Sequence, residues 1–251
     1  MKYTDHIGEF AEGKQILYRR YEPPTPSPYT LIFLHGAGEK GPLDGTLLPR
    51  VAKYSFTKHA HAGKIFDFNI VAVQTAESDF HDTMRVLPRY IKQKFDAKVI
   101  IVTGLSMGGY GTYFAKYLDK DNIIYAIAPI CGAHSKYPAS QWPEMKCWHF
   151  HGDRDTTVPL SRATSFINAY NAVHTSQIRL TVYAGIAHNS WDKAYSITEG
   201  QDELLQQIND WFHEAYPPVP PRDYLAEYNE LKIQRDSIIQ EMDSITLSQI
   251  K

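Results

Sequence analysis

The sequence predicts an α/β fold in which helices cover both faces of a mainly parallel sheet. Short apolar runs rich in Ile and Val recur along most of the 251 residues, and they mostly lack the alternation of a half-exposed sheet. Segments with a helical spacing of apolar residues lie between these runs. Such alternation of strands and helices is typical of parallel strands joined by right-handed crossovers.

The predicted elements follow one another regularly along the chain. Residues 8–24 are expected to add antiparallel strands at an edge of the sheet. A helix is predicted over 79–95, where Pro88 should either kink it or mark its true start. Further helices are predicted at 160–173 and 199–216. The remaining strands are predicted within 30–36, 68–74, 98–104, 123–132, 146–152 and 178–185.

Composition narrows the class of protein. The chain has 26 basic and 28 acidic residues, a net charge of −2, which gives no sign of nucleic-acid binding. The opening residues show no apolar run behind a basic leader, and no segment reaches the length of a membrane span. We therefore expect a soluble, cytoplasmic protein. The two cysteines, Cys131 and Cys147, lie in apolar stretches and are expected to be buried thiols.

A lone serine, Ser106, stands where an apolar strand passes into a helix, in "TGLSMGGYG". Gly104 and Gly108 lie two residues before and after it, and Gly109 follows. Glycines remove the Cβ atoms that would collide in a sharp strand-to-helix turn, and such a turn holds the hydroxyl above the sheet. A tight turn whose glycines only permit close packing explains the same short pattern, so the rest of the chain must decide.

Two further strand ends supply an acid and a base. Asp155 follows the strand at 146–152 and His188 follows the strand at 178–185, and active groups of such sheets lie beyond the carboxyl ends of the strands. Imidazole can take the proton of a serine hydroxyl, and a carboxylate can fix the imidazole tautomer. The order Ser106, Asp155, His188 therefore predicts a catalytic triad. Asp153 is the rival acid, with bracing of the turn as its alternative role.

Backbone amides are expected to complete the site. The small-residue loop after residue 34 can aim an N–H at a developing oxyanion, and we predict Ala37 as the donor. The N–H of Met107, directly after the serine, is the expected second donor. Backbone donors need no side chain, which explains why this loop is small rather than charged.

Four motifs together resemble those of α/β-hydrolase-fold serine esterases: "HGAGEKG", "GLSMGGYGT", "HGDRDTTVP" and "GIAHNSWDKAY". The resemblance is to the phospholipase/carboxylesterase and dienelactone-hydrolase-like families, with related polyester depolymerases and feruloyl esterases, and it covers residues 29–216. It implies a three-layer fold with about eight strands, with Ser106 as nucleophile, Asp155 as acid and His188 as base. Dienelactone hydrolase itself has cysteine at the elbow, so the serine here argues against a lactone-specific function.

Aromatic residues near these motifs are candidates for a substrate pocket, namely Tyr110, Trp142 and Trp191, although core packing explains Tyr110 equally well. Many lipases insert a helical lid in the region that corresponds to 132–145 of this chain. The segment is too short for a large lid, which predicts an open cleft and a preference for short or compact acyl groups.

Two histidine pairs have a spacing that can bind zinc: His59 with His61, and His149 with His151. No carboxylate-rich motif accompanies either pair. Structural hydrogen bonds are therefore the expected role of His149 and His151, as of His35, and neither a metal nor a cofactor is expected.

These residues together predict a serine hydrolase that cleaves small-molecule carboxylic esters through an acyl-enzyme. Peptide or thioester cleavage by the same triad is one alternative, because the same acyl chemistry serves amides and thioesters. A binding module that kept the fold without the activity is another, but every position that the chemistry needs is filled.

The chain is predicted to have two parts. Residues 1–216 form the catalytic domain, and 217–251 form a proline-rich linker and a C-terminal helix. Apolar residues of this helix recur at alternating spacings of four and three, which is the pattern of a helix-packing seam. The seam must dock on its own domain or on a second subunit, and a homodimer through this helix is the favoured hypothesis.

Overall fold

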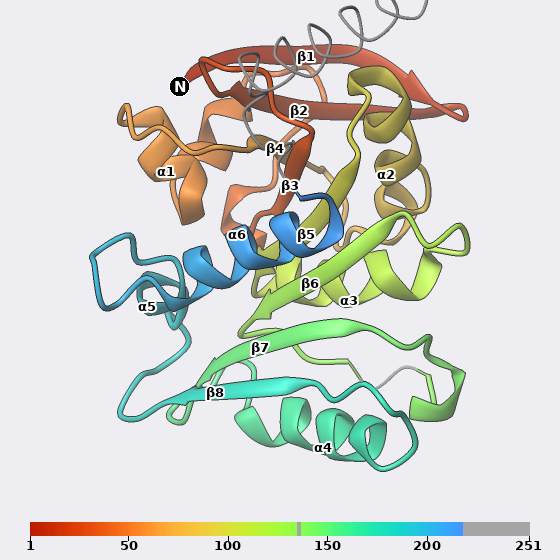
Figure 1. Cartoon of the computed structure of the whole chain (residues 1–251), viewed down its shortest axis with the longest axis vertical. Helices are drawn as coiled ribbons and strands as arrows, with labels where there is room; N and C mark the ends of the chain where they lie inside the picture. Colours follow the sequence, from red (N-terminus) through yellow and green to blue (C-terminus); the bar gives the residue numbers. More distant parts are fainter. Residues whose placement is uncertain (135–136, 218–251) are drawn as a thin grey trace, which may run out of the picture. The chain divides into compact units, whose positions relative to one another are not determined.

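The computed structural model of the protein describes residues 1–134 and 137–217, and the strands of this part form one eight-stranded sheet. The strands are β1 Lys2–Ala11, β2 Lys14–Glu22, β3 Tyr29–Leu34, β4 Asn69–Gln74, β5 Val99–Leu105, β6 Ile124–Ile130, β7 Lys146–Gly152 and β8 Arg179–Tyr183. Their order across the sheet is β1-β2-β4-β3-β5-β6-β7-β8 (Figure 1). β2 pairs antiparallel with β1 and with β4, whereas the pairs from β4 to β8 are parallel.

Helices cover both faces of this sheet (Figure 1). The α-helices are α1 Ser55–His61, α2 His81–Phe95, α3 Met107–Leu118, α4 Leu160–Asn171, α5 Trp191–Ala194 and α6 Glu203–Ala215. Short 3₁₀ helices are η1 Ala37–Glu39, η2 Leu48–Ala52 and η3 Ala139–Gln141. Buried side chains of α2, α3 and α4 share one hydrophobic cluster, and those of α1 and α6 share the cluster on the opposite face.

The central strands have no exposed residue, which is why their sequences do not alternate. Every residue of β3, β4 and β5 is buried. Ile32 and Val71 belong to the cluster under α2 and α3, and their neighbours Leu31 and Ile70 belong to the cluster under α6. Complete burial of such a side chain contributes about 1.5–3 kcal/mol, so these strands hold the layers together.

The predicted fold and the six strands predicted between residues 30 and 185 are confirmed, as are the antiparallel strands at one edge of the sheet. One expectation at Pro88 was wrong: α2 begins at His81, so the proline lies inside the helix and does not mark its start. A proline cannot donate to the carbonyl of Met84 four residues earlier. The helix continues because Leu87 and Ile91 on the same face are fully buried against the sheet.

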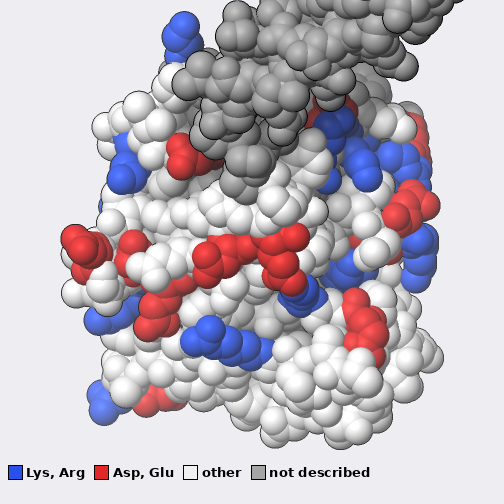
Figure 2. Space-filling model, in the orientation of Figure 1, with Lys and Arg blue, Asp and Glu red and all other residues white. Residues whose placement is uncertain are grey.

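Both cysteines are free and buried, as predicted. On the face that α6 covers, acidic side chains follow the helix with basic ones beside them (Figure 2), and one such pair is Lys146 with Glu214. Within residues 1–134 and 137–217, no helix is long and apolar enough to cross a bilayer.

Backbone contacts group the chain into one unit, Met1–Tyr216, and a second, Pro217–Lys251. Apart from its first residue, the second unit lies outside the described part of the chain. The predicted C-terminal helix, its seam and its role in a homodimer therefore stay predictions.

Candidate active site

The turn between β5 and α3 holds Ser106 in a strained backbone conformation, with φ 54° and ψ −115°. Its flanking glycines are required by close backbone contacts. A Cβ on Gly104 would lie 2.4 Å from the carbonyl oxygen of Gly108, and one on Gly108 would lie 2.0 Å from that of Leu34. Only hydrogen fits at either place. A non-glycine residue at such a positive φ costs about 1–3 kcal/mol, so packing around the turn must hold the serine in place.

The loop after β7 carries the two candidate acids, and the structure separates them. Asp155 is buried, and its Oδ1 accepts the backbone N–H groups of Thr157 and Val158, each at 2.9 Å. Asp153 is exposed and accepts the N–H of Gly185 at 2.7 Å. Asp153 thus braces the turn, which was its alternative role.

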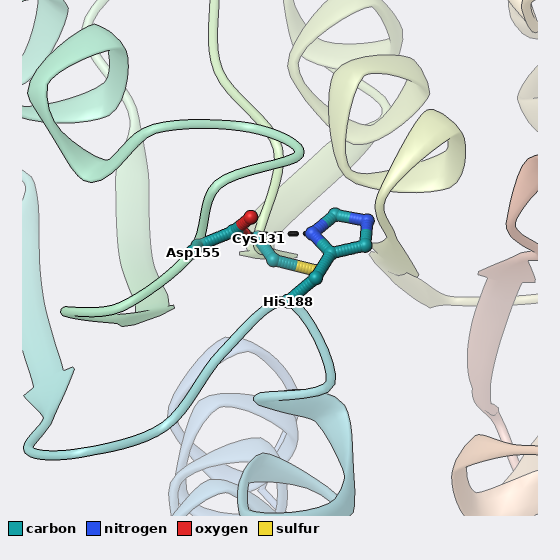
Figure 3. Close-up of side chains that lie close together, drawn as sticks. All are labelled: Cys131, Asp155 and His188. Carbon is teal, nitrogen blue, oxygen red and sulfur yellow. Dashed lines mark hydrogen bonds and ion pairs between the residues drawn. The ribbon is translucent and has the colours of Figure 1, made fainter.

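The loop after β8 brings His188 between the acid and the serine. Its Nδ1 lies 2.7 Å from Oδ2 of Asp155 (Figure 3), and its Nε2 lies 2.9 Å from Oγ of Ser106. An ionised carboxylate only accepts hydrogen bonds, so Nδ1 carries the proton and Nε2 is free to accept one from the serine. The three side chains therefore form one hydrogen-bonded chain in the order that general-base activation of a hydroxyl requires.

The two predicted oxyanion donors are each the first residue of a helix, Ala37 of η1 and Met107 of α3. N–H groups in the first turn of a helix have no acceptor within that helix. The loop of Ala37 abuts the start of α3, because a Cβ on Gly108 would also lie 2.7 Å from the carbonyl oxygen of His35.

His35 anchors this loop from below. Its Nδ1 donates to the carbonyl of Gly36 at 2.6 Å, and its Nε2 accepts the N–H of Thr75 at 3.2 Å. Burial lowers the pKa of His35 to about 4, with the bond to Gly36 opposing the shift in part. The ring is therefore neutral at pH 7, and it ties the loop to the end of β4 as the predicted structural hydrogen bonds require.

The three aromatic candidates have different places. The ring of Trp191 meets that of His188 edge to face, with centroids 5.4 Å apart, and the ring of Tyr54 also packs against Trp191, with centroids 5.6 Å apart. Tyr110 is half-buried on α3, one turn after the serine. Trp142 is only 4% exposed and packs in the core, so the structure does not bring it to an open pocket wall. Tyr54 was missed because a single aromatic residue outside any motif gives no signal.

Cys131, at the end of β6, is the neighbour that the sequence prediction overlooked. Its sulfur and the nearest ligand atoms of Asp155 and His188 all lie within 4.8 Å of one another (Figure 3). Its place directly after an apolar run was the available signal. Burial raises the pKa of this thiol to about 12, so it stays protonated at neutral pH.

Within the described ranges, that trio is the one cluster of three or more side chains able to hold a metal ion. The pairs His59 with His61 and His149 with His151 belong to no such cluster.

Comparisons with known proteins identify the family of the chain. A sequence model of the phospholipase/carboxylesterase family matches residues 62–199, which is more than half of the chain. A comparison with curated proteins found no match.

Solved structures share the fold at low identity. The chain is similar to a thermostable esterase, at 21% identity and a TM-score of 0.64, over 83% of this chain and 62% of that one, which is less than two thirds of its length. It is also similar to the acetyl xylan esterase of Aspergillus awamori, at 12% identity and a TM-score of 0.60, over 82% and 99% of the two chains. Esterase 2 of Thermogutta terrifontis matches at 15% identity and a TM-score of 0.56, over 86% and 96%.

The family match extends from the end of α1 past α5, and thus contains the serine turn and the loops of Asp155 and His188. These features meet on an eight-stranded, mostly parallel sheet of the same kind as in the esterases above. The chain therefore belongs to the phospholipase/carboxylesterase family, with the α/β-hydrolase fold, and is a carboxylesterase-type hydrolase.

Proposed function

We propose that the protein cleaves carboxylic esters through an acyl-enzyme on Ser106. The observation that carries this proposal is the unbroken chain from Ser106 through His188 to Asp155, with bonds of 2.9 and 2.7 Å. A serine hydroxyl is a weak nucleophile at neutral pH unless a base takes its proton, and this chain supplies the base in the right tautomer.

In the proposed reaction, Oγ of Ser106 bonds to the ester carbonyl carbon while its proton passes to Nε2 of His188. The N–H groups of Ala37 and Met107 donate to the oxyanion that develops on the carbonyl oxygen. The carbon–oxygen bond to the alcohol then breaks, and His188 returns the proton to the leaving alkoxide. Water repeats these steps on the acyl-serine, which releases the carboxylic acid and restores the hydroxyl.

We further propose that the acyl site prefers short or compact groups. The connection between β6 and β7 is short, and its described residues contain only the single 3₁₀ turn η3. Trp191 packs edge to face on His188, and Tyr54 packs against Trp191, so bulky aromatic side chains lie beside the base. A similar structure, esterase 2 of Thermogutta terrifontis, is known with butyrate bound and in a form phosphorylated by paraoxon.

The test compares the wild type with Ser106→Ala, using p-nitrophenyl butyrate hydrolysis and labelling by a fluorophosphonate probe. We expect the variant to lose on the order of 10⁴ to 10⁶ in kcat and all labelling, while its circular dichroism stays the same. Retention of more than about a tenth of the activity would exclude Ser106 as the nucleophile.

Acyl preference is tested with p-nitrophenyl esters from acetate to palmitate. We expect kcat/KM to be highest for the short members of this series. A steep rise with acyl length, or activation at a lipid–water interface, contradicts the proposed compact site.

A further inference from the structure

Two histidines of β7, His149 and His151, form a buried row behind the site. Neither has any exposed surface. The hydroxyl of Tyr113 lies 2.9 Å from Nδ1 of His149, and Nε2 of His149 lies 2.9 Å from Nδ1 of His151. Nε2 of His151 lies 2.8 Å from the carbonyl oxygen of Val158 and 3.3 Å from Oδ2 of Asp155. The row thus runs from α3 along one face of β7 to the carboxylate that holds His188.

The tautomers of His149 and His151 can be assigned by starting from the end of the row at Val158. Burial lowers the pKa of both histidines, so both rings are neutral at pH 7. The carbonyl of Val158 can only accept, so Nε2 of His151 must carry the proton and its Nδ1 must accept. Nε2 of His149 is then the donor to His151, and Nδ1 of His149 accepts from the hydroxyl of Tyr113. If the direction were reversed, Nε2 of His151 would carry a lone pair instead of a proton. That lone pair would face two acceptors, the carbonyl oxygen of Val158 and Oδ2 of Asp155.

We propose that His151 is a positioning residue for Asp155, and that Tyr113 and His149 hold His151 in the tautomer which lets it donate. This inference rests on the proposed function, because it assigns Asp155 as the acid of the triad. Two backbone amides reach Oδ1 of Asp155, while His188 and His151 reach Oδ2. Nε2 of His151 donates its hydrogen bond to the carbonyl of Val158 and also faces Oδ2 of Asp155 at 3.3 Å. The imidazole of His151 thus lies against the carboxylate oxygen that orients His188, and its position helps to set the position of that oxygen.

The expected loss of kcat can be bounded from the interaction that a His151 variant removes. Removal of the His151 donor leaves Asp155 and its bond to His188 in place, so the loss must be smaller than that of removing the acid. Displacement of a catalytic group by about 1 Å can cost about 100-fold in rate, so we expect a loss of about 10- to 100-fold in kcat. KM should stay unchanged, because His151 is buried and touches no substrate.

Two conservative variants of His151 distinguish a role in positioning Asp155 from a role in packing alone. In His151→Gln the side-chain amide nitrogen falls near the place of Nε2 and can still donate to Asp155. In His151→Asn the amide lies near the place of Nδ1 and reaches only toward His149. We expect His151→Gln to retain most of the wild-type kcat and His151→Asn to lose about 10- to 100-fold. Equal kcat for the two variants in folded protein overturns the positioning role and leaves the proposed reaction standing.

The tautomers are read directly from imidazole ¹⁵N chemical shifts of the wild type, with Tyr113→Phe as the far-end variant. We expect both histidines in the Nε2–H form in the wild type, and a mixture of tautomers at His149 in Tyr113→Phe. Tyr170→Phe is the matched control, since its hydroxyl bonds the carbonyl of Pro143. An Nδ1–H form or an imidazolium at His151 overturns the assignment. This measurement needs no ester hydrolysis, so it is decisive even if the histidine variants fold poorly or Ser106→Ala contradicts the proposed function.

Discussion

Asp153 and Asp155 are identical side chains two residues apart, yet they have different surroundings. Asp155 is buried, with His188 and two backbone amides as donors, whereas Asp153 faces solvent and receives one amide, that of Gly185. Burial and hydrogen-bond direction make only the first able to hold an imidazole in the tautomer needed for base catalysis.

The two aspartates therefore provide a matched pair of variants. Asp155→Asn should lower kcat by about 10⁴, because an amide N–H facing Nδ1 of His188 favours the wrong tautomer. Asp153→Asn should keep most of the activity, since it changes only a turn at the surface. The comparison uses kcat on p-nitrophenyl butyrate, with circular dichroism to verify folding. The opposite pattern would make Asp153 the acid.

Burial of His35 makes the free energy of unfolding depend on pH. Its pKa falls from the ordinary 6.5 to about 4 on folding, mainly through burial, so between these values the unfolded chain binds more protons than the folded one. Its contribution is therefore complete above about pH 6.5 and is lost as the pH falls toward 4, by at most about 3 kcal/mol. Urea unfolding at pH 7.5 and 4.5 measures the loss, and His35→Gln should show a smaller one. Equal losses in both proteins would assign the acid sensitivity to other groups.

At the scale of elements, the carboxyl ends of β3, β5, β7 and β8 deliver the four parts of the site, and very close backbone contacts set their positions. Gly152, the last residue of β7, lies under the loop that carries His188. A Cβ there would be 2.2 Å from the carbonyl oxygen of Ile186 and 2.4 Å from that of Ala187. The glycine thus sets the distance between the acid-bearing strand end and the base.

Gly152→Ala should therefore displace the loop of His188, since both contacts are with backbone that cannot turn aside. We expect a loss of about 10- to 100-fold in kcat together with lower stability. Gly200→Ala is the control: with φ 78° and nothing within 4 Å, it strains the backbone without touching the site. The control should lose stability by about 1 kcal/mol and keep its kcat. An unchanged kcat in Gly152→Ala would show that the loop tolerates the shift.

At the scale of the whole molecule, both faces of the sheet are covered within residues 1–216. One hydrophobic cluster lies beneath α2, α3 and α4 and the other beneath α1 and α6. All parts of the proposed site come from this unit. The unit Met1–Tyr216 therefore has its own core and carries every residue that the proposed chemistry uses.

A chain that ends at Pro221 should accordingly fold and keep the kcat of the full-length protein. If the C-terminal segment forms the predicted homodimer, the full-length protein has twice the mass of one chain in solution and the shortened protein does not. Light scattering at micromolar concentration measures both. A monomeric full-length protein would contradict the dimer, and loss of activity on truncation would show that the segment supports the site.

Local sequence patterns were sufficient for much of this architecture. Apolar runs without alternation predicted the buried strands, and glycines two residues either side of Ser106 predicted the turn, since only a residue without a Cβ fits there. At Pro88 the pattern left a kink and a helix start as alternatives, and the structure excludes the second, because the buried turns on either side continue the helix.

The sequence by itself determined the fold class and the family, because these depend on patterns and motifs that are local in the chain. It also predicted Ser106, Asp155 and His188 as nucleophile, acid and base. Only the tertiary structure decided that Asp155 rather than Asp153 meets His188, that Tyr54 packs against Trp191, and that Trp142 is buried in the core. The same holds for the neighbourhood of Cys131. These outcomes depend on which atoms come within a few ångströms of one another when distant strand ends meet. The local sequence around each residue does not predict such long-range contacts.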